Sequence, residues 1–152
     1  MCARRPRSER VCAAATTCSS RTGTQRATQT LTCFLAALGE RVAGGVIVET
    51  GLRSGREDRW REAYEKAGSG ELEALRNADP ELVDEDSAAL GAALGRVLDA
   101  LADGGRALIV GHSPTNEAAV FGLTGQIVSP ISKGAGVLLV ADDQGFRLET
   151  LD

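Results

Sequence analysis

An amphipathic segment followed by a short apolar one constrains the fold of this chain most strongly. Leucine and valine side chains recur at three- and four-residue spacing over Ser87–Ala102, which predicts a helix with one apolar face. Asp103–Gly105 ends that segment, and Ala107–Val110 then has the pattern of a fully apolar strand. A further helix is predicted over Pro114–Leu123. A buried strand between helices is typical of a sheet that helices cover on both faces.

The same reading of periodicity and turn residues places the other elements and predicts the domain organisation. We expect an arginine-rich, poorly ordered tail over residues 1–10 and a single α/β domain over residues 11–152. Its expected fold is a three-layer sandwich with a mostly parallel central sheet. The remaining predicted elements are a strand in Val11–Cys18, a helix over Ala27–Leu38, a strand at Val46–Val48, helices at Asp58–Ala67 and Glu71–Asn77 (closed by Asp79-Pro80), and hairpin strands at Gly136–Val140 and Phe146–Glu149.

Composition excludes several classes of function. The net charge of −4 gives no broad attraction to nucleic acid or anionic membranes, and 3% aromatic residues leave little for stacking on bases. No apolar run approaches the roughly 18 residues of a membrane span. The four cysteines form no C-x-x-C pair, and the one histidine lies far from them, so no metal site is predicted. We expect a cytoplasmic protein without nucleic-acid or membrane partners.

The turn Gly111–Pro114, directly after the apolar strand, is the sharpest candidate for a site. In open α/β sheets, ligands bind beyond the carboxyl ends of the strands. Ser113 is expected to cap the next helix, with Pro114 at its first position. The free amides and the helix dipole would then favour an anion beside His112. An imidazole there can donate a hydrogen bond to a phosphoryl oxygen or exchange a proton with it.

Two other interpretations of this turn compete with an anion site. In the first, the turn is merely structural: Ser113 caps the helix and His112 packs against the turn. In the second, Gly111–Thr115 is the G-x-S-x-G nucleophile elbow of a serine hydrolase, with Thr115 in place of the last glycine. A Ser–His–acid triad of that kind needs a histidine after the serine, and the chain has none. The sequence therefore excludes the hydrolase.

Three sequence motifs, in order along the chain, resemble the histidine phosphatase superfamily, the phosphoglycerate-mutase-like proteins. Val110–Pro114 looks like the family's late histidine motif. Upstream, Ser19-Ser20 and then Arg26–Thr30 resemble S-S-P-x-x-R-A-x-Q-T, although Ser20 and Arg26 stand two residues further apart than in the motif. Lys133–Gly136 resembles the approach to the family's closing strand. The resemblance runs from about Cys18 to the C-terminus and implies a phosphoglycerate-mutase-like fold.

The resemblance also implies roles for individual residues. In the family, a histidine in an R-H-G motif is the nucleophile, while arginines and the late histidine hold the phosphoryl oxygens and a carboxylic acid protonates the leaving oxygen. His112 matches the late histidine and would be the central residue of the site. Arg26, Ser113 and Ser20 would bind phosphate. The family's L-x-E acid is absent at Leu52–Ser54, so Glu49 and Glu57 are the candidate acids.

The chain has no R-H-G motif, and this changes the expected function. Two explanations fit: an N-terminally incomplete or frame-disrupted phosphatase, or a complete homologue that kept a phosphate pocket and lost turnover. Both predict weak or absent phosphatase activity. The expected function is a histidine-phosphatase-like domain that binds a phosphate or phosphomonoester without a cofactor, with hydrolysis reduced or lost because the nucleophilic histidine is missing. The alternative is a non-catalytic phosphate-binding, regulatory or interaction domain. The expected partners are a phosphorylated small molecule or a phosphoprotein, and a second copy in a homodimer.

Overall fold

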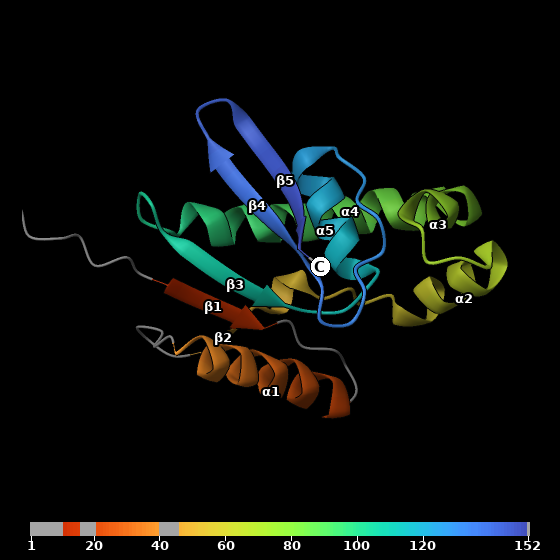
Figure 1. Cartoon of the computed structure of the whole chain (residues 1–152). Coiled ribbons are helices and arrows are strands. Elements are labelled where there is room, and N and C mark those ends of the chain that lie inside the picture. Colours follow the sequence, from red (N-terminus) through yellow and green to blue (C-terminus); the bar gives the residue numbers. More distant parts are fainter. Residues whose placement is uncertain (1–10, 16–20, 40–45, 152) are drawn as a thin grey trace, which may run out of the picture.

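A computed structural model describes residues 11–15, 21–39 and 46–151 of the chain. The predicted tail at residues 1–10 lies outside these residues, as does Ser20. Both helices and strands are present, and their order along the chain is shown in Figure 1. The elements are β1 (Val11–Ala15), α1 (Arg21–Leu38), β2 (Val46–Val48), the short 3-10 helix η1 (Thr50–Leu52), α2 (Glu57–Ala67), α3 (Leu72–Ala78), α4 (Pro80–Asp99), β3 (Arg106–Val110), α5 (Thr115–Thr124), β4 (Gly136–Asp142) and β5 (Gly145–Leu151).

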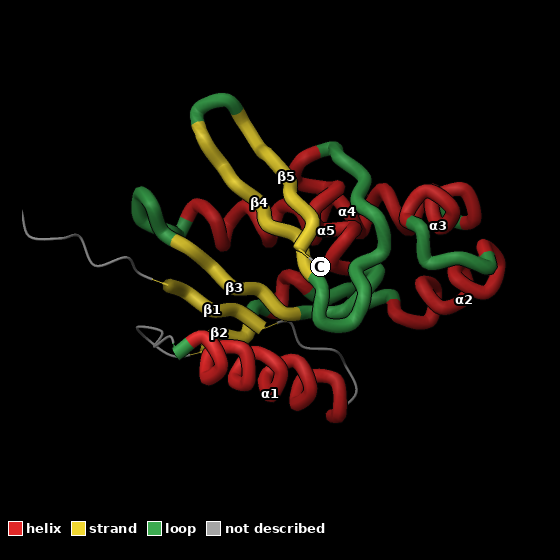
Figure 2. The backbone as a smooth tube through the Cα atoms, viewed as in Figure 1, coloured by secondary structure: helices red, strands yellow, loops and turns green. Residues whose placement is uncertain are grey.

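The strands form two separate sheets. A three-stranded parallel sheet has the order β2-β1-β3, with Ala15 paired in register to Val48 on one side and to Val110 on the other. The second sheet is the antiparallel hairpin β4–β5, in which Asp142 pairs with Gly145 across the turn. Figure 2 shows the hairpin standing apart from the parallel strands.

The predicted three-layer sandwich with a mostly parallel central sheet is therefore wrong. About 53% of the structure is helical, and the parallel strands are not joined to β4 and β5 in one sheet. The physical reason lies in the connections. The tight turn at Asp142–Gly145 lets β4 and β5 pair with each other locally, with Gly145 at a φ of 112° that favours glycine. Antiparallel neighbours need only such a turn, whereas a parallel strand needs a long crossover.

Helix α1 packs on one face of the parallel sheet. Ala27 and Leu31 of α1 are fully buried and contact Leu108 and Val110 of β3, together with Val46 of β2. These residues lie four apart on α1 and two apart on β3, as the periods of a helix and a strand require. Between them on β3, Ile109 faces the opposite way and packs against the larger core.

The larger core lies among the helices α2 to α5. Leu72, Leu75, Leu82 and Leu90 are at most 1% exposed within it. Helices α4 and α5 cross so closely that a Cβ built at Gly122 would lie 1.6 Å from the main-chain oxygen of Ser87. Only a residue without a side chain can occupy such a crossing.

The hairpin packs on this helical core through Leu139 of β4 and Leu148 of β5, which lie directly opposite each other in the sheet. Among the residues described, no helix is both long enough and apolar enough to cross a bilayer.

Candidate functional site

The carboxyl ends of the three parallel strands meet at one edge of the sheet. The register places Ala15, Val48 and Val110 side by side there. Glu49 follows β2 directly, and Gly111 and His112 follow β3. Figure 1 shows that the first turn of α1 lies on the same side as the arrowheads of β1 and β3. This edge is where ligands bind in open parallel sheets.

His112 is half-buried in the turn between β3 and α5. Its carbonyl oxygen accepts hydrogen bonds from Thr115 Oγ1 at 2.8 Å and from the Asn116 amide at 2.9 Å, which fix the histidine backbone to the start of α5. The imidazole Nε2 is buried and has no hydrogen-bond partner in the described part of the chain. A buried polar atom without a partner is uncommon, and functional sites are one of the places where it occurs.

Ser113 does not cap α5, contrary to expectation. The capping residue is Pro114, which follows a cis Ser113–Pro114 peptide bond and makes no side-chain cap hydrogen bond. The Ser113 hydroxyl instead donates to Glu117 Oε1 at 2.7 Å. Because a serine hydroxyl has one proton, this bond leaves Ser113 only lone pairs to offer a ligand. The Ser113 side chain is thus better suited to holding the turn than to donating to phosphate.

Glu117 is the residue of this site that sequence reasoning missed. It lies in the first turn of α5, is 1% exposed, and accepts a second hydrogen bond on Oε1 from the Ile131 amide at 2.7 Å. Its other oxygen, Oε2, is buried without a partner among the described residues. The only signal in the sequence is an acidic residue directly before the small, apolar stretch Ala118–Val120.

The other predicted site residues lie in different elements, and not all of them are at the sheet edge. Arg26 lies in α1, beside the buried Ala27, and its side chain is outside what the structure describes. Glu49 lies at the sheet edge, where its Oε1 accepts a hydrogen bond from the Gly51 amide at 2.8 Å and caps η1. Glu57 lies further along, at the start of α2, where it pairs with Arg53 at 3.4 Å. The structure thus brings Glu49 and His112 to one sheet edge, whereas Glu57 belongs to α2.

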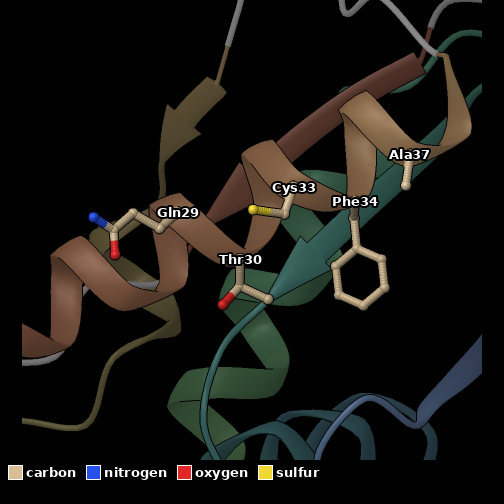
Figure 3. A pocket seen from close by; sticks show the side chains of 5 residues that line it. All are labelled: Gln29, Thr30, Cys33, Phe34 and Ala37. Atoms are coloured by element: carbon tan, nitrogen blue, oxygen red, sulfur yellow. The ribbon is translucent and has the colours of Figure 1, made fainter.

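Two surface hollows lie elsewhere on the molecule, and neither is lined by His112. One, of about 550 Å³, runs along α1 and is lined by Cys33, Phe34 and Ala37 with Gln29 and Thr30 (Figure 3). The other, of about 400 Å³, lies around residues 53–59 ahead of and within α2. Its arginines already face carboxylates, since Arg53 pairs with Glu57 and Arg56 with Glu85. It therefore offers no uncompensated positive charge to an anion.

No group of three or more metal-ligating side chains occurs within residues 11–15, 21–39 and 46–151. Comparisons with models of protein families, with curated proteins and with solved structures find no match to this chain.

Proposed function

We propose that this chain binds the phosphate group of a phosphomonoester at the carboxyl end of its parallel sheet, with His112 as the central residue. The observation that carries the proposal is the buried His112 Nε2, which has no partner among the described residues. A phosphoryl oxygen would supply the missing hydrogen bond. An imidazolium or a neutral imidazole with its proton on Nε2 could donate it.

Other features of the sheet edge support an anion there. Helix α5 begins three residues after His112, and the positive end of its dipole favours negative charge. By resemblance to histidine phosphatases, Arg26 would approach from α1. The Glu117 carboxyl opposes this attraction, because it lies in the same first turn of α5. A positive contribution from Arg26 is therefore a necessary part of the proposal.

Turnover is expected to be low or lost. The motif resemblance assigns His112 to the phosphoryl oxygens, and no second histidine is present in the sequence to act as nucleophile. The ligand would be a phosphorylated small molecule or a phosphoprotein, and the same proposal places the protein in the cytoplasm, where both occur.

A titration with inorganic phosphate and phenyl phosphate tests the proposal. Because His112 is the one histidine of the chain, its imidazole signals in a nuclear magnetic resonance spectrum need no assignment by mutation. We expect these signals to shift saturably at millimolar ligand in the native chain. His112→Ala has no imidazole to observe and is the control for phosphate release. The rate of phosphate release from an aryl phosphate is expected to be equal in both proteins. A native imidazole signal that phosphate leaves unchanged would contradict the proposal.

An interaction domain is the second candidate, and the exposed apolar side chains of α1 favour it. Phe34 is 40% and Leu38 66% exposed, and Phe34 lines the hollow of Figure 3. Such side chains suit a contact with a second copy of the chain. A homodimer would be supported if the molecular mass in solution rises with protein concentration in the native protein but not in Phe34→Ser. A monomer at all concentrations would exclude it.

A further inference from the structure

Two donors that are far apart in the sequence converge on one oxygen of Glu117. The Ser113 hydroxyl belongs to the turn that carries His112, and the Ile131 amide belongs to the segment between α5 and β4. Both bonds are 2.7 Å long, and the carboxyl that accepts them is 1% exposed. Figure 1 shows this segment running from the end of α5 to the start of β4.

We infer that Glu117 is a positioning residue of the His112 site: its carboxyl holds the His112–Pro114 turn and the segment around Ile131 together so that the imidazole faces the ligand. This inference rests on the proposed function. The His112 backbone is already fixed to α5 through Thr115 and Asn116. Glu117 adds a second constraint, because it accepts the hydrogen bond from the side chain of Ser113, the residue that follows His112.

A purely electrostatic role for Glu117 makes a different prediction. A buried carboxylate in the first turn of α5 would repel a phosphate dianion, so removing its charge by any substitution would strengthen binding. A positioning role depends on the accepting oxygen instead of the charge. Glutamine keeps a carbonyl oxygen that can accept both hydrogen bonds, whereas alanine keeps none. The two substitutions therefore separate the two roles.

The experiment is the phosphate titration of the His112 imidazole in Glu117→Gln, Glu117→Ala and Ser113→Ala. We expect Glu117→Gln to bind phosphate as tightly as the native chain or more tightly. Glu117→Ala is expected to bind about tenfold more weakly, because both donors lose their acceptor. Ser113→Ala removes one donor only and should weaken binding by less. Glu73→Ala, at an exposed carboxylate of α3, is the matched control and should bind as the native chain does.

Amide hydrogen exchange at Ile131 provides a readout that does not need a ligand. Exchange there should be faster in Glu117→Ala than in the native chain and unchanged in Glu117→Gln, with folding verified by the fluorescence of the single tryptophan. If Glu117→Ala binds phosphate as tightly as the native chain or more tightly, the positioning role is wrong and the proposed function stands. If the native chain binds no phosphate, the proposed function fails. The positioning role then fails as well if Glu117→Ala leaves both the imidazole signals and the Ile131 exchange unchanged.

Discussion

The Arg59 guanidinium contacts the Asp79 carboxylate through two hydrogen bonds, from Nε to Oδ2 at 2.7 Å and from Nη2 to Oδ1 at 2.8 Å. Asp79 is also the N-cap of α4, where its Oδ1 accepts a hydrogen bond from the Leu82 amide at 3.1 Å. One carboxylate thus joins the first turn of α2 to the start of α4, the longest of the described helices. The stability of the helical core should depend on it.

Removal of the Asp79 carboxylate is expected to destabilise the protein measurably. Asp79→Ala deletes the cap of α4, which by itself is worth about 1 kcal/mol. The free energy of unfolding from urea titrations measures the loss. Asp58→Ala is the matched control, since Asp58 belongs to an exposed pair with Arg61 on the same helix as Arg59 and should change stability very little. Equal effects of the two substitutions would show that Asp79 is not a structural cap.

The same residue predicts how stability depends on pH. The hydrogen bonds from Arg59, followed by the amide of Leu82, lower the pKa of Asp79 in the folded protein. A lowered native pKa means that the unfolded chain takes up the proton first as the pH falls. The contribution of Asp79 is therefore fully present above the ordinary pKa of aspartate, near 4, and is lost as the pH falls through the native pKa. Urea titrations between pH 6 and 3 should show a smaller loss of stability in Asp79→Ala than in the native chain.

A buried polar network around the single tryptophan provides a second test of stability. Trp60 Nε1 donates to Asp86 Oδ2 at 2.8 Å, and the Ser54 hydroxyl donates to the same oxygen. Asp86→Ala leaves both donors buried without this acceptor, which typically costs about 1–3 kcal/mol. Asp86→Asn keeps an acceptor and should cost less. Asp84 lies on the same helix as Asp86 and forms an exposed ion pair with Arg76 of α3, so Asp84→Ala should cost at most about 1 kcal/mol. Tryptophan fluorescence during denaturation reports all three.

Two glycines in helices should respond in opposite directions to the same substitution. Gly122→Ala drives a methyl group into the Ser87 main chain and should lower stability by roughly 1–3 kcal/mol. A Cβ at Gly95 of α4 would meet only Leu123 Cδ1 at 3.5 Å, an ordinary contact. Gly95→Ala should therefore raise stability, by up to about 1 kcal/mol, through helix propensity. Midpoints of thermal unfolding measure both, and a neutral Gly122→Ala would contradict the close crossing of α4 and α5.

Phosphate should raise the melting temperature of the native chain. A ligand that binds only the folded state stabilises it by about 2.7 kcal/mol at one hundred times its Kd. The rise should saturate with phosphate and should be smaller or absent in His112→Ala. Sodium chloride at equal ionic strength separates binding of the oxyanion from a general salt effect, and an equal rise with both salts would count against a phosphate site.

Local structure could be predicted from the sequence well, because periodicity and turn residues act over short distances. Helix α2 and strands β2 and β3 lie within a residue of their predicted bounds. Helix α4 begins at Pro80, seven residues before the predicted start. Asp79 closes α3 as its C-cap, as predicted, but it is also the N-cap of α4, with Pro80 as the first helical residue. The division into two sheets depends on which strands pair over long distances, and no pattern along the chain encodes that choice.

The site could be predicted in part. The apolar run before His112 predicts that its strand-to-helix turn lies at the end of a sheet strand, and the structure shows it there. Glu117 was missed because glutamate is almost never fully buried, so an isolated one in a helix is normally interpreted as a surface residue. Its two donors, Ser113 and Ile131, become neighbours only in the folded chain.

The close crossing of α4 and α5 has a mechanical consequence for the histidine. Since Gly122 lies directly against the Ser87 main chain, α5 has no clearance to slide or roll on its neighbour. The two bonds to the His112 carbonyl extend that rigidity to the backbone of the histidine. A force applied to α4 would therefore displace α5 and the His112 backbone together with it.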